Sequence, residues 1–220
     1  MASGPQTQPA PAQSLQNYTF PHDRLRLRQT NADKTPLVLI ACGSFSPITY
    51  LHLRMFELGA DFAKFNTDFE VMGGYFSPVS DAYKKAGLAS AEHRYVQLYI
   101  YSTFVTANIP CRLRMCELGA AESPWLMVDP WEARQAEYVP TAQVLDHFEH
   151  EINEVLGGAE KPDGTRVKCR ILLLAGADLI QTMCKHDLPQ YSDRLHVRAT
   201  SSQTQLRIFL GLTRFKFYKK

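Results

Sequence analysis

The pattern of hydrophobic and polar positions predicts alternating strands and helices. Residues 37–40, Leu-Val-Leu-Ile, form an apolar run without polar alternation, which is typical of a parallel strand covered on both faces. From Thr49 onward apolar residues recur every three or four positions, which predicts a helix. These positions are Leu51, Met55, Leu58 and Phe62. Gly43 lies between the two patterns, so the segment predicts a strand, a glycine turn and a helix.

Further along the chain the same two patterns return. Residues 69–75, 125–128 and 167–174 are short apolar segments that predict strands, and residues 144–152 carry a helical apolar stripe. That stripe ends at two glycines, Gly157 and Gly158, and the turn sequence KPDG follows. Strands alternating with helices are typical of an α/β fold with a parallel sheet.

Composition narrows the class of protein. A chain of 220 residues with 45% hydrophobic content has room for one α/β domain. The net charge of +2, from 24 basic and 22 acidic residues, gives no general signal for nucleic acid or membrane binding, so we expect neither partner. Five cysteines without a C-x-x-C pair argue against a disulfide framework and a zinc site. With no secretory signal or membrane span apparent, we expect a soluble intracellular protein.

The N-terminal residues differ in composition from the rest. Residues 1–33 are rich in Pro, Gln, Ser and Ala and then in arginine, and we interpret them as a disordered tail before a domain at 34–220. The arginines allow three interpretations: a nuclear localisation signal, a phosphate-binding site or ordinary solvent-exposed residues. Location in the nucleus, the cytoplasm or both is therefore the expectation.

Residues 43–52 carry the first candidate chemistry. Gly43 has no Cβ and lets backbone N–H groups approach a phosphate, while Pro47 limits the movement of the loop. His52 falls in the first turn of the predicted helix. From there it would donate hydrogen bonds, as imidazolium or as neutral N–H, to charge that develops on a phosphorus under attack. A purely structural histidine is the alternative.

Three later loops follow predicted strands, where ligands bind in open parallel sheets. Lys84 and Lys85 follow the second strand and would clamp a phosphate, unless they are ordinary surface lysines. Trp131 follows the strand at 125–128 and either contacts a ligand or caps the core. Gly176 and Asp178 follow the strand at 167–174, where the carboxylate would bind ribose hydroxyls or cap a helix.

Three strings together resemble a known family. The first is G-S-F-x-P-x-T-x-x-H, at Gly43, Ser44, Phe45, Pro47, Thr49 and His52. The second is SPVSDAYKKAGL followed by HR, and the third is VDPWEARQAEYVPT. They are similar to motifs of the eukaryotic, fungal-like nicotinamide mononucleotide adenylyltransferases of the nucleotidyltransferase superfamily. The resemblance implies a Rossmann-like open parallel sheet with helices on both faces.

The resemblance also implies roles for individual residues. As catalytic residues it implies His52 and Lys85. As ATP-binding residues it implies Gly43, Ser44, Phe45, Thr49, Gly176, Asp178, Thr204 and Arg207. As residues for the mononucleotide it implies Tyr83, Lys85, Trp131, Tyr138 and Thr141. It implies Mg²⁺ carried by ATP, with no protein metal ligands.

Two segments depart from the family pattern. Residues 95–111 form an atypical insert rich in aromatic and β-branched residues. Residues 184–220 are divergent, so the C-terminal part of the fold is expected to be incomplete.

The expected activity is AMP transfer from ATP to nicotinamide or nicotinate mononucleotide, giving NAD or its deamido form and pyrophosphate. One alternative is a catalytically impaired nucleotide-binding remnant of the same fold, and another is an adenylyltransferase for a different phosphate substrate. The choice of amide or acid substrate and homo-oligomerisation stay open.

Overall fold

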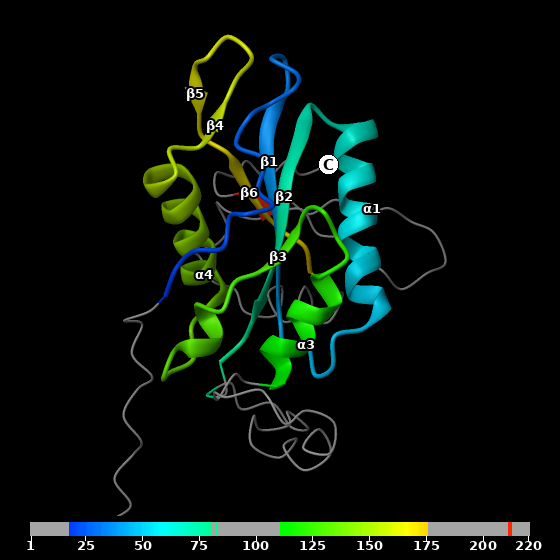
Figure 1. The fold of residues 1–220 in the computed structure, drawn as a ribbon, viewed down its shortest axis with the longest axis vertical. Helices are drawn as coiled ribbons and strands as arrows, with labels where there is room; N and C mark the ends of the chain where they lie inside the picture. Colours follow the sequence, from blue (N-terminus) through cyan, green and yellow to red (C-terminus); the bar gives the residue numbers. More distant parts are fainter. Residues whose placement is uncertain (1–17, 81, 83–110, 176–210, 213–220) are drawn as a thin grey trace, which may run out of the picture.

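The computed structural model describes residues 18–80, 82, 111–175 and 211–212 (Figure 1). In chain order the first elements are β1 (Thr35–Gly43), α1 (Tyr50–Asn66), β2 (Phe69–Pro78), α3 (Cys111–Ala120), β3 (Leu126–Val128) and the 3₁₀ helix η3 (Glu132–Arg134). They are followed by α4 (Thr141–Glu149), the π-helical η4 (His150–Val155), β4 (Ala159–Glu160), β5 (Arg166–Val167), β6 (Arg170–Leu173) and β7 (Gly211–Leu212).

The main sheet has the strand order β3-β2-β1-β6-β7. The first four strands are parallel to one another, and β7 pairs antiparallel with β6. Figure 1 shows α1 and α3 on one side of the sheet and α4 on the other. The predicted α/β class, with a parallel sheet and helices on both faces, is confirmed.

The central strand β1 is buried on both faces, as its apolar run predicts. Val38 and Ile40 pack into the cluster on the α4 side, while Leu37, Leu39 and Ala41 pack into the cluster on the α1 side. This alternation follows from the two-residue period of a strand. Each apolar residue of β1 therefore contributes to one of two separate cores.

Helix α1 is confirmed, although its buried face differs from the predicted stripe. The residues buried on it are Met55, Phe56, Gly59 and Ala63, whereas Leu51 is 65% exposed. A Cβ at Gly59 would stand 3.0 Å from Leu174 Cδ2, so the missing side chain allows close packing of the helix on the sheet. Leu51 in the first turn lies outside this contact.

The segment predicted as one strand at 167–174 is divided in two. Val167 belongs to β5, which pairs antiparallel with β4, and β6 begins only at Arg170. Asn153 holds the chain between them, because its side chain donates to the Cys169 carbonyl at 2.9 Å and accepts from the Cys169 N–H at 2.7 Å. These bonds replace strand pairing at Cys169.

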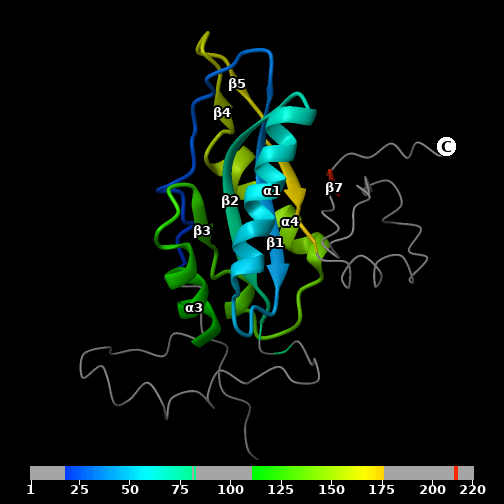
Figure 2. The ribbon, with the colours of Figure 1, turned by 90° about the vertical axis from the view of Figure 1, so that its right-hand side faces the viewer.

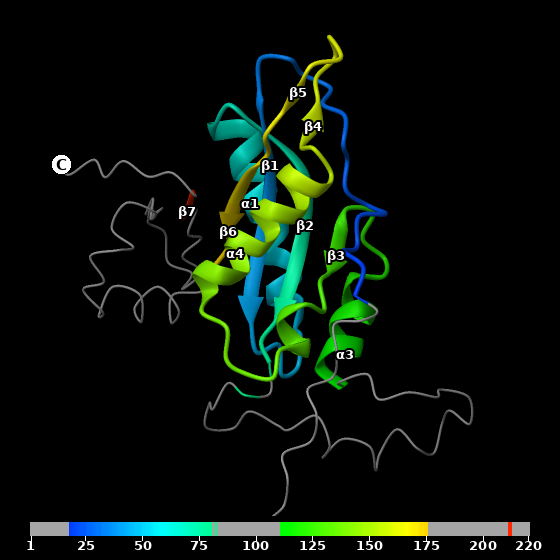
Figure 3. The ribbon, with the colours of Figure 1, turned by 90° about the vertical axis from the view of Figure 1, so that its left-hand side faces the viewer.

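The prediction of a disordered tail is wrong for residues 18–33. Residues 18–30, which we call the N-terminal strap, lie along the sheet beside β3 (Figure 3). Phe20 and Leu25 are buried in the core on the α4 side. Backbone hydrogen bonds join Arg26 N–H to the Met72 carbonyl at 2.9 Å and Glu160 N–H to the Leu27 carbonyl at 2.7 Å. Residues 1–17 lie outside the described part of the chain.

Cys42, Cys116 and Cys169 are free thiols. Within the described ranges, we find no helix with the length and apolar character needed to cross a membrane.

Candidate functional site

The carboxyl ends of the parallel strands meet at one edge of the sheet, which we call the carboxyl edge. Figure 2 shows the arrowheads of β1 and β6 pointing the same way beside α1. The strands β1 and β6 are neighbours in the sheet, but α1, which follows β1, and α4, which precedes β6, cover opposite faces (Figure 1). A crevice is therefore expected at the carboxyl ends of these two strands. The loop after β1, residues 43–49, lies at this switch point.

This loop is tightly packed on itself. A Cβ at Gly43 would stand 3.1 Å from the Phe45 ring, and that ring is itself 3% exposed. Phe45 has a φ of 40°, and the Ser46–Pro47 peptide bond is cis. The Ser44 carbonyl accepts a 3.1 Å hydrogen bond from the buried Arg112 guanidinium. Phe45 therefore shapes the loop from inside, and a ligand here would meet backbone groups.

His52 occupies the third position of α1, as predicted. Its Nδ1 accepts a 2.9 Å hydrogen bond from the Thr49 backbone N–H and lies 2.8 Å from Thr49 Oγ1. The His52 N–H in turn donates to the Thr49 carbonyl at 3.0 Å. A nitrogen that accepts from a backbone N–H carries no proton, so a neutral His52 has its proton on Nε2. Of the two forms considered from the sequence, this geometry favours the neutral N–H donor.

A second group of predicted residues lies in the loop between β3 and α4, residues 129–140. The Tyr138 ring is 50% exposed, and Thr141 begins α4. Trp131 is stacked on the His147 ring, with centroids 4.1 Å apart and an interplanar angle of 6°. One face of the indole is thus covered by protein, while half of the Tyr138 surface is exposed to solvent.

Two ionisable residues that the predicted site did not include contact this loop or belong to it. Asp129 is 1% exposed and accepts hydrogen bonds from Tyr18 and from Trp131 N–H. His147 is 2.9 Å from the same carboxylate. The sequence places Asp129 directly after a buried strand, which indicates a position near the site. Its hydrogen-bond partners are visible only in the folded structure.

Glu132 is buried beside the ends of β1 and β2. It accepts a 2.5 Å hydrogen bond from the Ser77 hydroxyl, and Ser77 is paired with Cys42 in the sheet. Burial raises the pKa of the Glu132 carboxyl to about 7, and the charge of Asp129 adds to this, whereas the Ser77 hydrogen bond and Arg112 oppose it. Glu132 therefore changes protonation near neutral pH.

Cys42 has the properties expected of a structural thiol. Burial, with the Glu132 charge as the next cause, raises the pKa of this thiol well above its ordinary value. A protonated thiol is a poor nucleophile.

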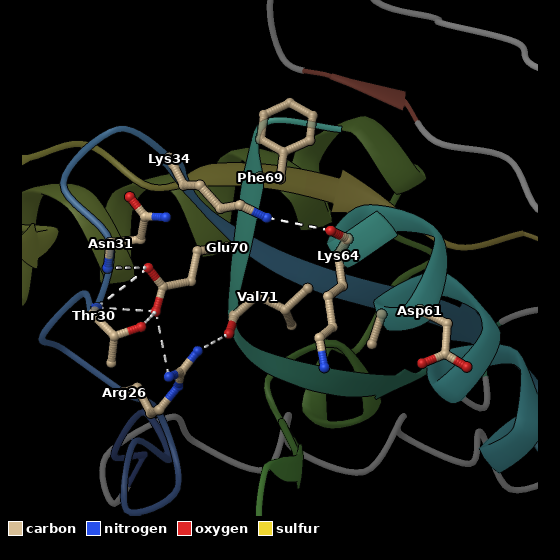
Figure 4. Close-up of a pocket in the computed structure, with 10 residues that line it drawn as sticks. Arg26, Thr30, Asn31, Lys34, Asp61, Lys64, Phe69, Glu70 and Val71 are labelled. Atoms are coloured by element: carbon tan, nitrogen blue, oxygen red, sulfur yellow. Dashed lines mark hydrogen bonds and ion pairs between the residues drawn. The ribbon is translucent and has the colours of Figure 1, made fainter. Parts of the chain in front are cut away.

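A hollow lined by described residues lies at the opposite, amino edge of the sheet. It measures about 440 Å³ and lies between the strap, the end of α1 and the start of β2. Figure 4 shows Glu70 at its centre, bonded to Thr30, Asn31 and Arg26, with Lys34 reaching the Lys64 carbonyl at 3.3 Å. The Glu70 carboxylate is thus satisfied by its neighbours, and none of the predicted site residues that the structure describes lines this hollow.

The remaining predicted residues fall outside the described part of the chain. They are Tyr83, Lys85, Gly176, Asp178, Thr204 and Arg207. Among the residues that the structure does describe, no group of three or more His, Cys, Asp or Glu side chains could hold a metal ion.

Curated proteins similar to this chain share one activity in their names. Nicotinamide/nicotinic acid mononucleotide adenylyltransferase 2 of Saccharomyces cerevisiae is 48% identical over 187 residues, covering 84% of this chain and 43% of that protein. The Schizosaccharomyces pombe adenylyltransferase of the same name is 48% identical, covering 84% of this chain and 46% of that protein. The one from Arabidopsis thaliana is 39% identical over 165 residues, covering 75% and 59%.

No protein-family model matches the chain. The chain spans less than half the length of the two fungal relatives. Identity near one residue in two over most of this chain, together with the parallel sheet, nevertheless places it within one family. The chain belongs to the fungal-like nicotinamide/nicotinic acid mononucleotide adenylyltransferases of the nucleotidyltransferase superfamily.

Proposed function

We propose that this chain transfers the AMP part of ATP to nicotinamide or nicotinate mononucleotide, forming NAD or its deamido form and releasing pyrophosphate. The observation that carries the proposal is the loop after β1. The helix α1 that follows this loop carries His52, whose Nδ1 accepts from Thr49 N–H, which orients an Nε2–H donor at the first turn of α1. Such a donor is suited to charge that develops on a phosphoryl group in transit.

The reaction needs positioning more than a protein nucleophile. An oxygen of the mononucleotide phosphate forms a bond to the α-phosphorus of ATP, and the bond from that phosphorus to the β-phosphate oxygen breaks as pyrophosphate leaves. In-line alignment and stabilisation of charge do most of the catalysis. The protonated state of Cys42 agrees with a mechanism without covalent protein intermediates.

The residues on each loop have distinct proposed tasks. His52 would donate to the α-phosphate, and the backbone of residues 43–45 would line the ATP site. Tyr138 would stack on the nicotinamide ring, and the Thr141 hydroxyl would bond to its carboxamide or carboxylate. The half-exposed Tyr138 ring, three residues before the start of α4, supports this assignment.

A divalent metal, for which we propose Mg²⁺, would neutralise charge on the ATP phosphates when bound. The buried carboxylates at the carboxyl edge do not fit it as ligands, because Asp129 and Glu132 are 1% and 2% exposed and already hydrogen-bonded. Mg²⁺ is often held mainly by substrate phosphates and water, and we therefore assign it to ATP.

The test is synthesis of NAD and pyrophosphate by the purified 220-residue chain, supplied with nicotinamide mononucleotide, ATP and Mg²⁺. Nicotinate mononucleotide and phosphopantetheine, each in place of nicotinamide mononucleotide, measure substrate choice. We expect turnover with one or both mononucleotides and none with phosphopantetheine. Folded protein that binds a mononucleotide without turnover would instead support the nucleotide-binding alternative.

A further inference from the structure

Asp129 is the centre of a buried hydrogen-bond network that joins three parts of the chain. Its Oδ1 accepts from the Tyr18 hydroxyl at 3.0 Å and from the Trp131 N–H at 3.1 Å. Its Oδ2 lies 2.9 Å from His147 Nε2. Tyr18 belongs to the N-terminal strap, Trp131 to the 129–140 loop and His147 to α4.

The protons in this network can be assigned from the donors and acceptors. The Tyr18 hydroxyl gives its one proton to Asp129, so the Tyr18 oxygen, 3.0 Å from His147 Nε2, can only accept from that nitrogen. Nε2 therefore carries a proton, which lies between Asp129 and Tyr18. Burial, and next the charge of Asp129, raises the pKa of Tyr18 well above its usual range, so its proton stays in place.

The network holds both ends of the loop that carries the proposed mononucleotide residues. Asp129 is the first residue of the loop after β3, and His147 lies in the helix that Thr141 begins. The stacking of His147 on Trp131 adds a contact within the loop. Without Tyr18, the carboxylate would lose one of three donors while still buried, which is costly.

The strap that presents Tyr18 is held by contacts of its own. Phe20 packs 5.2 Å from the Tyr75 ring, and the Tyr75 hydroxyl donates to the Pro21 carbonyl at 2.8 Å. Arg24 donates from Nη1 to the carbonyls of Ala120, Ser123 and Leu126, at 2.6 to 3.0 Å. Tyr18 is therefore delivered to Asp129 by a segment with several attachments to the domain.

We propose that Tyr18 and His147 are positioning residues that fix the 129–140 loop for the mononucleotide, an inference that rests on the proposed function. Neither is required to touch the substrate. The effect is specific to one substrate, because the proposed ATP residues that the structure describes lie in the loop after β1 and not in the 129–140 loop. The N-terminal strap is thus part of the mononucleotide site.

The test compares two tyrosine variants that each remove one hydroxyl contact between the strap and the domain. Tyr18→Phe breaks the bond to Asp129, and Tyr75→Phe breaks the bond to Pro21 but removes none of the hydrogen bonds to Asp129. For Tyr18→Phe we expect the KM for the mononucleotide to rise about fivefold, the equivalent of one ordinary hydrogen bond. The KM for ATP should stay within about twofold, and Tyr75→Phe should change neither.

Equal rises in both KM values, or a rise in Tyr75→Phe as large as in Tyr18→Phe, would overturn the proposal. His147→Phe separates the two contributions of the histidine, because it keeps a ring against Trp131 and removes the bond to Asp129. We expect its mononucleotide KM to rise at least as much as in Tyr18→Phe, and an unchanged KM would contradict the role of His147.

A second readout does not depend on turnover. In a Trp125→Phe background, Trp131 is the one tryptophan of the chain, and acrylamide quenching of its fluorescence reports how well the loop is held. We expect more quenching in Tyr18→Phe and no change in Tyr75→Phe, and unchanged quenching in both would overturn the proposal. If the unmodified chain shows no turnover, the proposed function fails, and this readout still decides whether Tyr18 orders the loop.

Discussion

Two buried glutamates at opposite ends of the sheet have opposite electrostatic environments. At the amino edge, burial alone would raise the pKa of Glu70, but hydrogen bonds from Thr30 and Asn31 and the charge of Arg26 lower it below its ordinary value. At the carboxyl edge, burial dominates for Glu132, which accepts a hydrogen bond from the Ser77 hydroxyl. The Glu70 carboxyl is thus ionised at neutral pH, whereas the Glu132 carboxyl has a pKa near neutral pH.

The contrast separates stability from function. The polar groups around Glu70 form a closed set that attaches the strap to β2. At the carboxyl edge, charge is buried with fewer donors, and perturbed groups of this kind are typical of functional sites. A hollow lies at the stable amino edge, so in this chain a hollow does not by itself identify the site.

The largest expected effect compares one side chain from each end. His52→Ala should lower kcat about 100- to 1000-fold, the usual cost of removing a donor to transition-state charge. Lys34→Ala at the amino edge should leave kcat within about twofold, since this side chain donates to the Lys64 carbonyl, far along the sheet from the carboxyl edge. Steady-state kinetics of both variants check this, and a His52→Ala enzyme with normal kcat would contradict the role of His52.

Glu132→Gln should remove a pH dependence of stability. The folded carboxyl has a pKa of about 7 against an ordinary 4.5, so between these values the folded state holds a proton that the unfolded chain releases. The free energy of unfolding therefore falls as pH rises across this window, by about 3 kcal/mol in all, and is level above it. Urea unfolding from pH 4.5 to 8 should show this decline in the unmodified chain and lose it in the variant. A decline of equal size in both would show that other groups cause it.

Glu70→Gln should lower the stability of the folded chain and leave catalysis unchanged. The amide would turn an NH₂ group toward the N–H donors of Thr30 and Asn31 and lose the pairing with Arg26. We expect a loss of about 2 kcal/mol in the free energy of unfolding, measured by urea titration at pH 8. Turnover should be retained, and a selective loss of kcat would contradict the separation of the two edges.

The sequence predicted the sheet and the loop after β1 because both depend on local patterns. The run 37–40 is apolar without alternation, and His52 follows a helix start at Thr49. The strap was missed although it has a pattern of its own. Arginines alternate here with Leu25, Leu27 and Gln29, and Leu25 and Gln29 are buried. The alternation is typical of a strand, but the high arginine content favoured the interpretation as a solvated tail.

The parts that sequence reasoning could not find depend on contacts between distant residues. Tyr18 meets Asp129 across 111 positions, and no local pattern encodes such a pair. The division of 167–174 likewise depends on Asn153, sixteen residues earlier. Trp131 was identified by its place after a strand, yet its stacking on His147 requires the packed helix α4.

The most direct test of the contrast between the two edges is hydrogen exchange of the 220-residue chain, with and without nicotinamide mononucleotide and ATP. We predict slower exchange in residues 43–52 and 129–141 when both ligands are present, and unchanged exchange in residues 26–34 and 60–71. Protection confined to the amino edge, around the hollow beside Glu70, would contradict the assignment of the site to the carboxyl edge.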